Sequence, residues 1–136
     1  MNRPICKDII FLKKKAVKAT KDDLSTGKDL LDTLIFHKNE CVGLAANMIG
    51  VNKAIIVVNM GMLNVVMYNP KITKKEKPYT VMEGCLSLEG QRTTIRYESI
   101  TVEYEDSSFN KKTMNLNGFY AQIVQHEIDH LNGIMI

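Results

Sequence analysis

The hydrophobic positions of this chain change period along its length, and each period predicts a different kind of element. From residue 20 to about residue 37, leucine and isoleucine recur at helical spacing, behind acidic residues typical of a helix start. Between residues 54 and 116, apolar and β-branched residues form short runs separated by turn residues. From residue 117 to Gly133 the period is helical again, and Gly133 stands where a helix C-cap belongs.

The middle of the chain predicts antiparallel strands. Residues 54–58 and 63–68 predict a strand pair joined by a short turn, which Asn69-Pro70 ends. The Lys-rich stretch from Lys71 to Pro78 is expected to be a surface loop. Further strands are expected at residues 93–95, 100–104 and 112–116. Because the strands are grouped between helices, we expect an α+β fold in which antiparallel strands pack around a central C-terminal helix, with an N-terminal helix.

Composition narrows the class of protein. With 136 residues and 45% hydrophobic residues, we expect one domain spanning residues 1–136. The net charge of only +3 gives no case for a specific nucleic-acid partner, and the clusters Lys13-Lys14-Lys15 and Lys71 to Lys77 are expected to be solvated. Three widely spaced cysteines suit a reducing cytosol, and no stretch predicts secretion or a membrane span. We therefore expect a cytoplasmic protein.

The segment from Gln125 to Gly133 carries the clearest chemistry, because it contains His-Glu-x-x-His. On a helix, His126 and His130 lie on one face, where both imidazoles can reach one cation. Glu127 is turned away from such a cation but is near enough to take a proton from water. The pattern predicts two metal ligands and one general base. The competing interpretation is an amphipathic helix with two incidental histidines.

A catalytic metal site typically has three protein ligands and leaves a fourth position for water. The spacing along the chain does not choose the third ligand. Cys85 has the best local setting, since Gly84 lets the backbone turn and approach, although a buried inert cysteine would look the same. The open candidates are Cys85, Cys41, Cys6, the carboxylates and His37, the last of which is expected on the surface at a helix end.

Three stretches of the chain belong together as motifs: Gly43-Leu44-Ala45-Ala46, Glu83-Gly84-Cys85-Leu86-Ser87 and Gln125-His126-Glu127-Ile128-Asp129-His130-Leu131-x-Gly133. Together they resemble the three motifs of the peptide deformylase family, and the similarity spans nearly the whole chain. That family removes the formyl group from the initiator methionine of new bacterial and organellar polypeptides. The resemblance implies an Fe²⁺ cofactor, for which Zn²⁺ or another divalent metal can substitute. It also implies N-formylmethionyl peptides as partners, on nascent chains near the ribosome, and a monomeric protein.

The resemblance also assigns roles to individual residues. It implies Cys85, His126 and His130 as metal ligands and Glu127 as the catalytic acid and base. The N–H of Leu86 would help to bind the formyl oxygen. The remaining assignments concern the substrate: backbone near Val42, Gly43 and Gly84 would pair with it, Ile123 would line the methionine pocket, and Arg92 would stand at the entrance.

The chain departs from the family pattern at several positions. Met48 stands where the first motif has a catalytic glutamine, and a thioether donates no hydrogen bond, so we expect reduced activity. If this stretch is extended, the side chain of Asn47 points to the opposite face and cannot substitute. Cys41 replaces a glycine, Glu89 replaces a proline, and the sequence stops three residues after Gly133, where most members continue.

Two alternatives to a deformylase remain. A noncatalytic metal-containing homologue that binds N-terminal peptides would be consistent with Met48. A zincin-type endopeptidase would share His-Glu-x-x-His but gives no reason for Glu-Gly-Cys-Leu-Ser. The three motifs together favour a metal-dependent hydrolase of the deformylase type.

Overall fold

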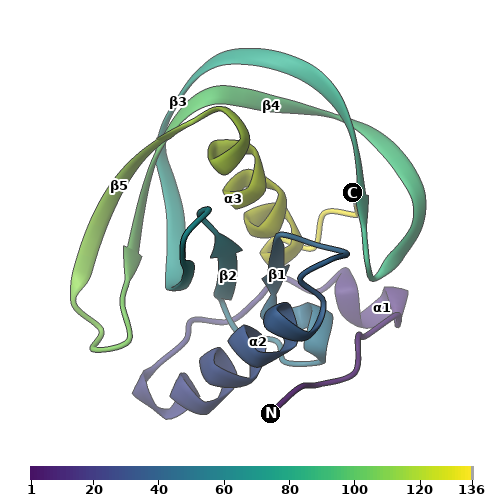
Figure 1. The fold of residues 1–136 in the computed structure, drawn as a ribbon, viewed down its shortest axis with the longest axis vertical. Coiled ribbons are helices and arrows are strands. Elements are labelled where there is room, and N and C mark those ends of the chain that lie inside the picture. Colours follow the sequence, from purple (N-terminus) through teal and green to yellow (C-terminus); the bar gives the residue numbers. More distant parts are fainter. Residues whose placement is uncertain (136) are drawn as a thin grey trace.

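The computed structural model describes residues 1–135, apart from the side chain of Leu88. At its centre lies helix α3 (Gly118–Leu131), with strands above it and on both sides and helix α2 (Leu24–Phe36) below (Figure 1). One antiparallel sheet has the strand order β1-β2-β3-β4-β5. Its strands are β1 (Gly43–Ala45), β2 (Ile55–Asn59), β3 (Asn64–Cys85), β4 (Leu88–Glu105) and β5 (Lys111–Asn117). The α+β fold with N-terminal and C-terminal helices is thus confirmed.

Helix α2 forms where the sequence predicts it. The preceding 3-10 turn η1 (Lys21–Asp23) carries a capping box, in which the Thr20 side chain and the Asp23 carboxylate each accept a backbone N–H. Leu30 and Leu34 are buried on the face of α2 that meets β2. Two shorter helical segments, α1 (Ile9–Leu12) and η2 (Ala46–Ile49), complete the helices. Within residues 1–135, no helix is long and apolar enough to cross a membrane.

The hydrophobic core lies where β2 and the two long helices meet. Every residue from Ile55 to Val58 is fully buried, because β2 is an inner strand with helices packed against it. Val124 and Ala121 of α3 belong to the same cluster. Full burial of one aliphatic side chain contributes about 1.5–3 kcal/mol, so this cluster holds α3 firmly in place.

Strands β3 and β4 form a long two-stranded ribbon that arches over α3 (Figure 1). The predicted surface loop from Lys71 to Pro78 is therefore wrong, since this stretch pairs with β4 from Glu103 to Tyr97. Because lysine and proline are depleted in strands, the composition of this stretch did not predict the pairing. The ribbon accommodates them with register shifts after Tyr68 and Ile72. The strands expected at 93–95 and 100–104 are likewise two parts of the single strand β4.

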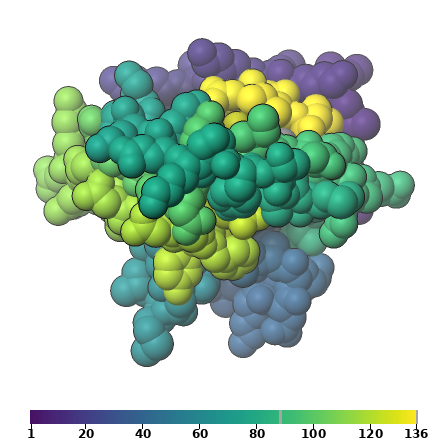
Figure 2. Space-filling model, turned by 90° about the horizontal axis from the view of Figure 1, so that it is seen from above, coloured from purple at the N-terminus to yellow at the C-terminus, as the bar shows by residue number. Residues whose placement is uncertain are grey.

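The C-terminal end of α3 is closed by a Schellman motif. Gly133 has a φ of +74°, its N–H donates to His130 O at 3.0 Å, and the Ile134 N–H donates to Asp129 O at 3.0 Å. The N-terminal segment packs against this end, where the Ala16 N–H donates to Leu131 O at 2.7 Å. Figure 2 shows the first residues (purple) and the last residues (yellow) together along one edge. The close contact fixes the helix end that follows His130.

We predict that Gly133→Ala destabilises the protein by more than its backbone strain alone. A Cβ at residue 133 would lie 2.2 Å from the carbonyl oxygen of Lys13, on top of the cost of a positive φ. Gly50 is the matched control, because its φ is +82° and a Cβ added there would meet nothing within 4 Å. Gly50→Ala should lower the free energy of unfolding by about 1–2 kcal/mol. Gly133→Ala should lower it by about 1–3 kcal/mol more, and urea unfolding measures both changes. Equal losses would show that the Lys13 contact is unimportant.

Candidate metal and catalytic site

Three side chains that can ligate a metal converge at one point. Helix α3 carries His126 and His130 one turn apart, and their Nε2 atoms face each other at 3.0 Å. Cys85, at the end of β3, completes the group, and one ligand atom from each of the three residues lies within 4.8 Å of the others. A thiolate with two imidazoles suits zinc or iron(II). The donor set therefore fits a divalent metal, although the ligand role of each residue remains a prediction.

The turn between β3 and β4 shapes the surroundings of Cys85. Gly84 lies opposite Gln91, and a Cβ on Gly84 would lie 3.4 Å from the carbonyl oxygen of Gly90, in van der Waals contact. Beyond Cys85 the chain turns, and the Ser87 N–H donates to Cys85 Sγ at 3.4 Å. A backbone donor of this kind stabilises a thiolate. The motif Glu-Gly-Cys-Leu-Ser thus supplies both close backbone packing and a donor to the sulfur.

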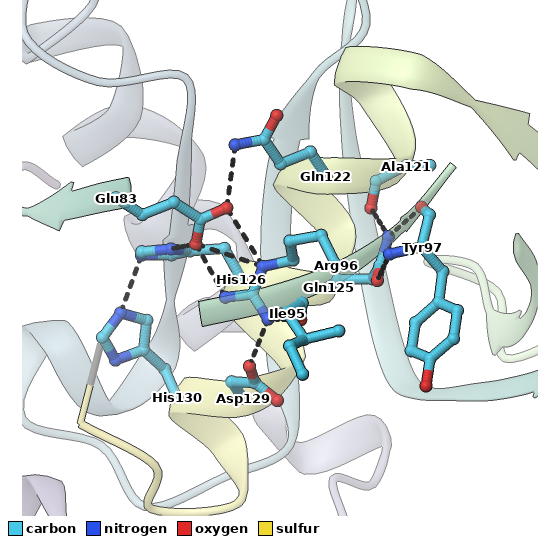
Figure 3. A network of polar contacts seen from close by, with 10 residues as sticks. All are labelled: Glu83, Ile95, Arg96, Tyr97, Ala121, Gln122, Gln125, His126, Asp129 and His130. Atoms are coloured by element: carbon cyan, nitrogen blue, oxygen red, sulfur yellow. Dashed lines mark hydrogen bonds and ion pairs between the residues drawn. The ribbon is translucent and has the colours of Figure 1, made fainter. Parts of the chain in front are cut away.

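Glu83 holds His126 from the side away from His130. Its Oε1 lies 2.7 Å from His126 Nδ1, so the carboxylate accepts the proton on that nitrogen and leaves Nε2 facing the metal group (Figure 3). Arg96 donates to both carboxylate oxygens at 2.7–3.1 Å. Burial alone would raise the pKa of Glu83, but the hydrogen bonds from His126, Arg96 and Gln122 outweigh it and lower the pKa to about 2. Glu83 is therefore a carboxylate that fixes the imidazole.

Arg96 links the ribbon to α3. Its Nη1 donates to Asp129 Oδ2 at 2.6 Å, next in sequence to His130, while its other nitrogens bind Glu83 (Figure 3). Arg96 and Glu83 are both buried, and such a pair is costly to break on one side. Sequence reasoning named Glu83 and Asp129 only as motif letters and missed Arg96 altogether. No local signal marks Arg96, because its partners lie on two other elements.

The pKa values of the two histidines are shifted in opposite directions. Burial, with the positive charge of His126 beside it, lowers the pKa of His130 to about 3, so this imidazole is neutral as a ligand must be. Burial would also lower the pKa of His126, but hydrogen bonds to Cys85 and Glu83 outweigh it and raise the pKa to about 10. A metal bound at His126 would therefore have to displace a proton from this imidazole.

Glu127 is a buried carboxylate without a full set of partners. Its Oε1 has no hydrogen-bond partner among the described residues. Burial, and then the charge of Glu83, raises the pKa of Glu127 to about 7. A Cβ on Gly43 would lie 3.0 Å from Glu127 Oε2 and 2.8 Å from Ile123 Cγ2, so β1 can approach the carboxylate only with glycine here. A group with these properties can accept a proton and return it near neutral pH.

A cleft of about 570 Å³ opens above this group. It brings together most of the side chains expected at the site from the sequence. Arg92 lies outside the lining of the cleft, where it donates to Glu89 O at 3.1 Å. His130 is not part of the lining either, because it is buried beneath the cleft. The expected residues that line the cleft are Val42, Gly43, Met48, Gly84, Cys85, Leu86, Ile123, His126 and Glu127.

Met48 lies in the wall of the cleft and supplies no donor. Its side chain is buried, and its Sδ accepts the Ala45 N–H at 3.4 Å. Residues 46–49 form the 3-10 segment η2, so the argument that applied to Asn47 in an extended stretch does not hold here. Asn47 Nδ2 instead donates to His130 O at 2.8 Å, and Asn47 is not part of the lining. Neither residue presents an amide to the cleft.

The other open ligand candidates fall elsewhere. His37 ends α2 and lies 3.4 Å from Glu40, and Cys6 is bound through its backbone to Met48 O. Cys41, which the sequence left open as a third-ligand candidate and which departs from the family pattern, does line the cleft. Burial, and then the charge of Glu127, raises the pKa of Cys41 to about 12, so this cysteine is a neutral thiol. Within the described residues, only Cys85 joins the two histidines.

Three comparisons relate the chain to known proteins. A family model described as polypeptide deformylase matches residues 4–136. A Clostridium beijerinckii protein named peptide deformylase is 57% identical over 136 residues, covering 100% of both chains. The crystal structure of a peptide deformylase from Legionella pneumophila has a TM-score of 0.89 at 32% identity, covering 99% of this chain and 83% of that one. An Acinetobacter baumannii class I type b peptide deformylase with Met-Ala-Ser bound has a TM-score of 0.87 at 30% identity, covering 99% and 97%.

We predict that Cys85→Ala greatly weakens metal retention, because it removes one of three protein ligands. Glu127→Ala should keep its metal, since Glu127 is not part of the ligand group. Elemental analysis of both variants after dialysis measures the metal directly. Full occupancy in Cys85→Ala would exclude this cysteine as a ligand.

We predict that Glu83→Gln weakens metal affinity roughly 10–100-fold through the orientation of His126. A neutral amide can still contact Nδ1 but no longer offers a charged acceptor, and Arg96 keeps only one of its two carboxylate partners, Asp129. Competition with a metal chelator gives the affinity, and thermal unfolding separates it from loss of the fold. The control is Glu89→Gln, at an exposed residue of β4 just after the turn that follows Cys85. An unchanged affinity in Glu83→Gln would contradict the positioning role.

Proposed function

Because the chain belongs to the peptide deformylase family and is thus a metal-dependent hydrolase, we propose that it removes the formyl group from N-formylmethionyl peptides at the cleft described above. One observation carries the proposal: a Cys-His-His group lies at the base of a cleft beside a buried carboxylate with an unpartnered oxygen. Such an arrangement suits the hydrolysis of an amide by water. Cys85, His126 and His130 are the proposed metal ligands.

The chain's own residues divide the chemistry between them. A divalent metal bound by the three ligands supplies Lewis acidity toward water and the formyl oxygen. Glu127 takes a proton from the attacking water as the water oxygen bonds to the formyl carbon. Glu127 then returns this proton to the amine as the carbon–nitrogen bond breaks, so that formate and a free amino terminus are formed. A carboxyl group with a pKa of about 7 suits both transfers.

The backbone around the cleft suits a peptide in extended conformation. β1 is the terminal strand of the sheet, and Val42 and Gly43 line the cleft beside its outer edge. We propose that the substrate pairs with this edge and with Gly84 on the facing wall, as peptides do when they extend a sheet. The Leu86 N–H is the proposed donor to the formyl oxygen. Ile123 lines the pocket for the first side chain, and Arg92 stands outside the lining at the entrance.

The remaining assignments are also proposals. Fe²⁺ is the proposed native metal, with Zn²⁺ or another divalent metal able to replace it, because the thiolate and imidazole donors accept either. The protein is proposed to act as a monomer in the cytoplasm on nascent chains near the ribosome. Its activity is proposed to be reduced, because Met48 supplies no hydrogen-bond donor to the cleft.

The direct test is an assay of anaerobically prepared, iron-loaded protein on formyl-Met peptides, with acetyl-Met peptides as the control for selectivity. Formate release that disappears in Glu127→Ala supports the proposal. The alternative is a noncatalytic homologue that binds N-terminal peptides, and Met48 is the observation that favours it. No formate at full metal occupancy, together with measurable peptide binding, would support that alternative.

We predict that Met48→Gln raises the turnover number on formyl-Met peptides by a factor on the order of 10²–10³, the usual effect of one oxyanion donor. The carbonyl of the new amide can accept the Ala45 N–H that Met48 Sδ now accepts, which leaves its N–H groups for the substrate. The change nearly conserves volume, so the fold should tolerate it. Steady-state kinetics at equal metal content measure the gain. A folded, metal-loaded variant with unchanged turnover would contradict the account of Met48.

A further inference from the structure

Two side-chain amides line the cleft, although Met48 supplies none. Among the described residues that line it, Gln91 and Gln122 carry one. Gln91 lies at the exposed end of the ribbon, opposite Gly84. Gln122 lies deeper, on the first half of α3 and one turn before His126, so the two side chains share a face of the helix. The cleft therefore has a polar group within a wall formed by α3.

The amide of Gln122 is held in one orientation. Its Nε2 lies 2.8 Å from Glu83 Oε2, and Glu83 is ion-paired with Arg96, so the carboxylate can only accept. The NH₂ group must therefore face Glu83, and Figure 3 shows the amide oxygen turned away from it. One N–H is taken by Glu83. Among the described residues the second N–H and the carbonyl oxygen have no hydrogen-bond partner, so both remain for a ligand.

The surroundings of Gln122 indicate which part of a ligand it meets. On α3 its neighbours in the lining are Phe119 and Ile123, and Met82 of β3 lines the same cleft. Glu83 contacts His126 through Nδ1, whereas the Nε2 of His126 faces His130. Gln122 thus lies on the side of His126 that is turned away from the metal group. An apolar wall with one fixed amide at this place suits the side chain of the first residue better than the formyl group.

We propose that Gln122 is a specificity-determining residue that hydrogen-bonds the end of the substrate's first side chain. The cleft would then accept N-formyl peptides whose first side chain is long, unbranched and carries a hydrogen-bond acceptor near its end. Methionine sulfoxide has a strong acceptor of this kind, methionine a weak one, and norleucine has none. This inference rests on the proposed function, because it presumes that the first side chain enters this cleft.

The test compares three N-formyl tripeptides that differ only in the first residue: methionine, methionine sulfoxide or norleucine. The measured quantity is the ratio of kcat/KM for the sulfoxide peptide to that for the norleucine peptide. Gln122→Met keeps the length of the side chain and removes the amide, so it should lower this ratio by about tenfold. Gln91→Met removes the other amide of the cleft and should leave the ratio unchanged. Gln122→Leu provides a second variant if the first does not fold.

Each outcome bears on one proposal. If the wild type hydrolyses formyl-Met peptides and the ratio is the same in both Gln122 variants, Gln122 does not set specificity, and the proposed function still stands. If the metal-loaded wild type hydrolyses none of the peptides, the proposed function fails, and calorimetry with the same three peptides tests Gln122 through the ratio of their Kd values. An equal fall in kcat/KM for all three peptides would indicate a structural role and overturn the inference.

Discussion

The Glu83 carboxylate is the point on which the arrangement of the site depends. It is buried between the ribbon and α3, accepts from Arg96 and Gln122, and fixes His126 through Nδ1. Without it, Arg96 would be a buried charge with Asp129 as its one carboxylate partner among the described residues, which is a costly state. The same carboxylate lies two residues before Cys85 in β3. One group therefore sets the position of one proposed ligand through the backbone and of another through its imidazole.

The parts of the site that follow from local geometry could be predicted from the sequence. His126, Glu127 and His130 lie on one helix, so their spacing alone gives their relative positions. Cys85 was one of several candidates until the resemblance to a family was considered, because its distance from α3 depends on how the ribbon bends. Arg96 could not have been found, since its contacts with Glu83 and Asp129 require the register of β3 and β4 and the position of α3 together.

The fold shows the same division between local and tertiary information. The helices at 24–36 and 118–131 follow from apolar period and capping residues. The stretch from Lys71 to Pro78 has the composition of a loop, yet it is part of β3 because β4 pairs with it along the ribbon. Most of its side chains are exposed, so burial imposes no alternating pattern that a sequence reader could detect. Tertiary pairing overrides propensity here.

β1 is the terminal strand of the sheet, and its outer edge bears on the range of polypeptides that the protein would accept as substrates. Hydrogen bonds between main chains are the same for every residue except proline, so a peptide held along that edge contributes affinity without being read for its sequence. Under the proposed function, discrimination would be confined to the one side chain that enters the cleft, past Ile123 and Gln122. A processing protein of this design would not distinguish polypeptides by most of their sequence. It would respond instead to the feature that new chains have in common, the chemistry of their first residue.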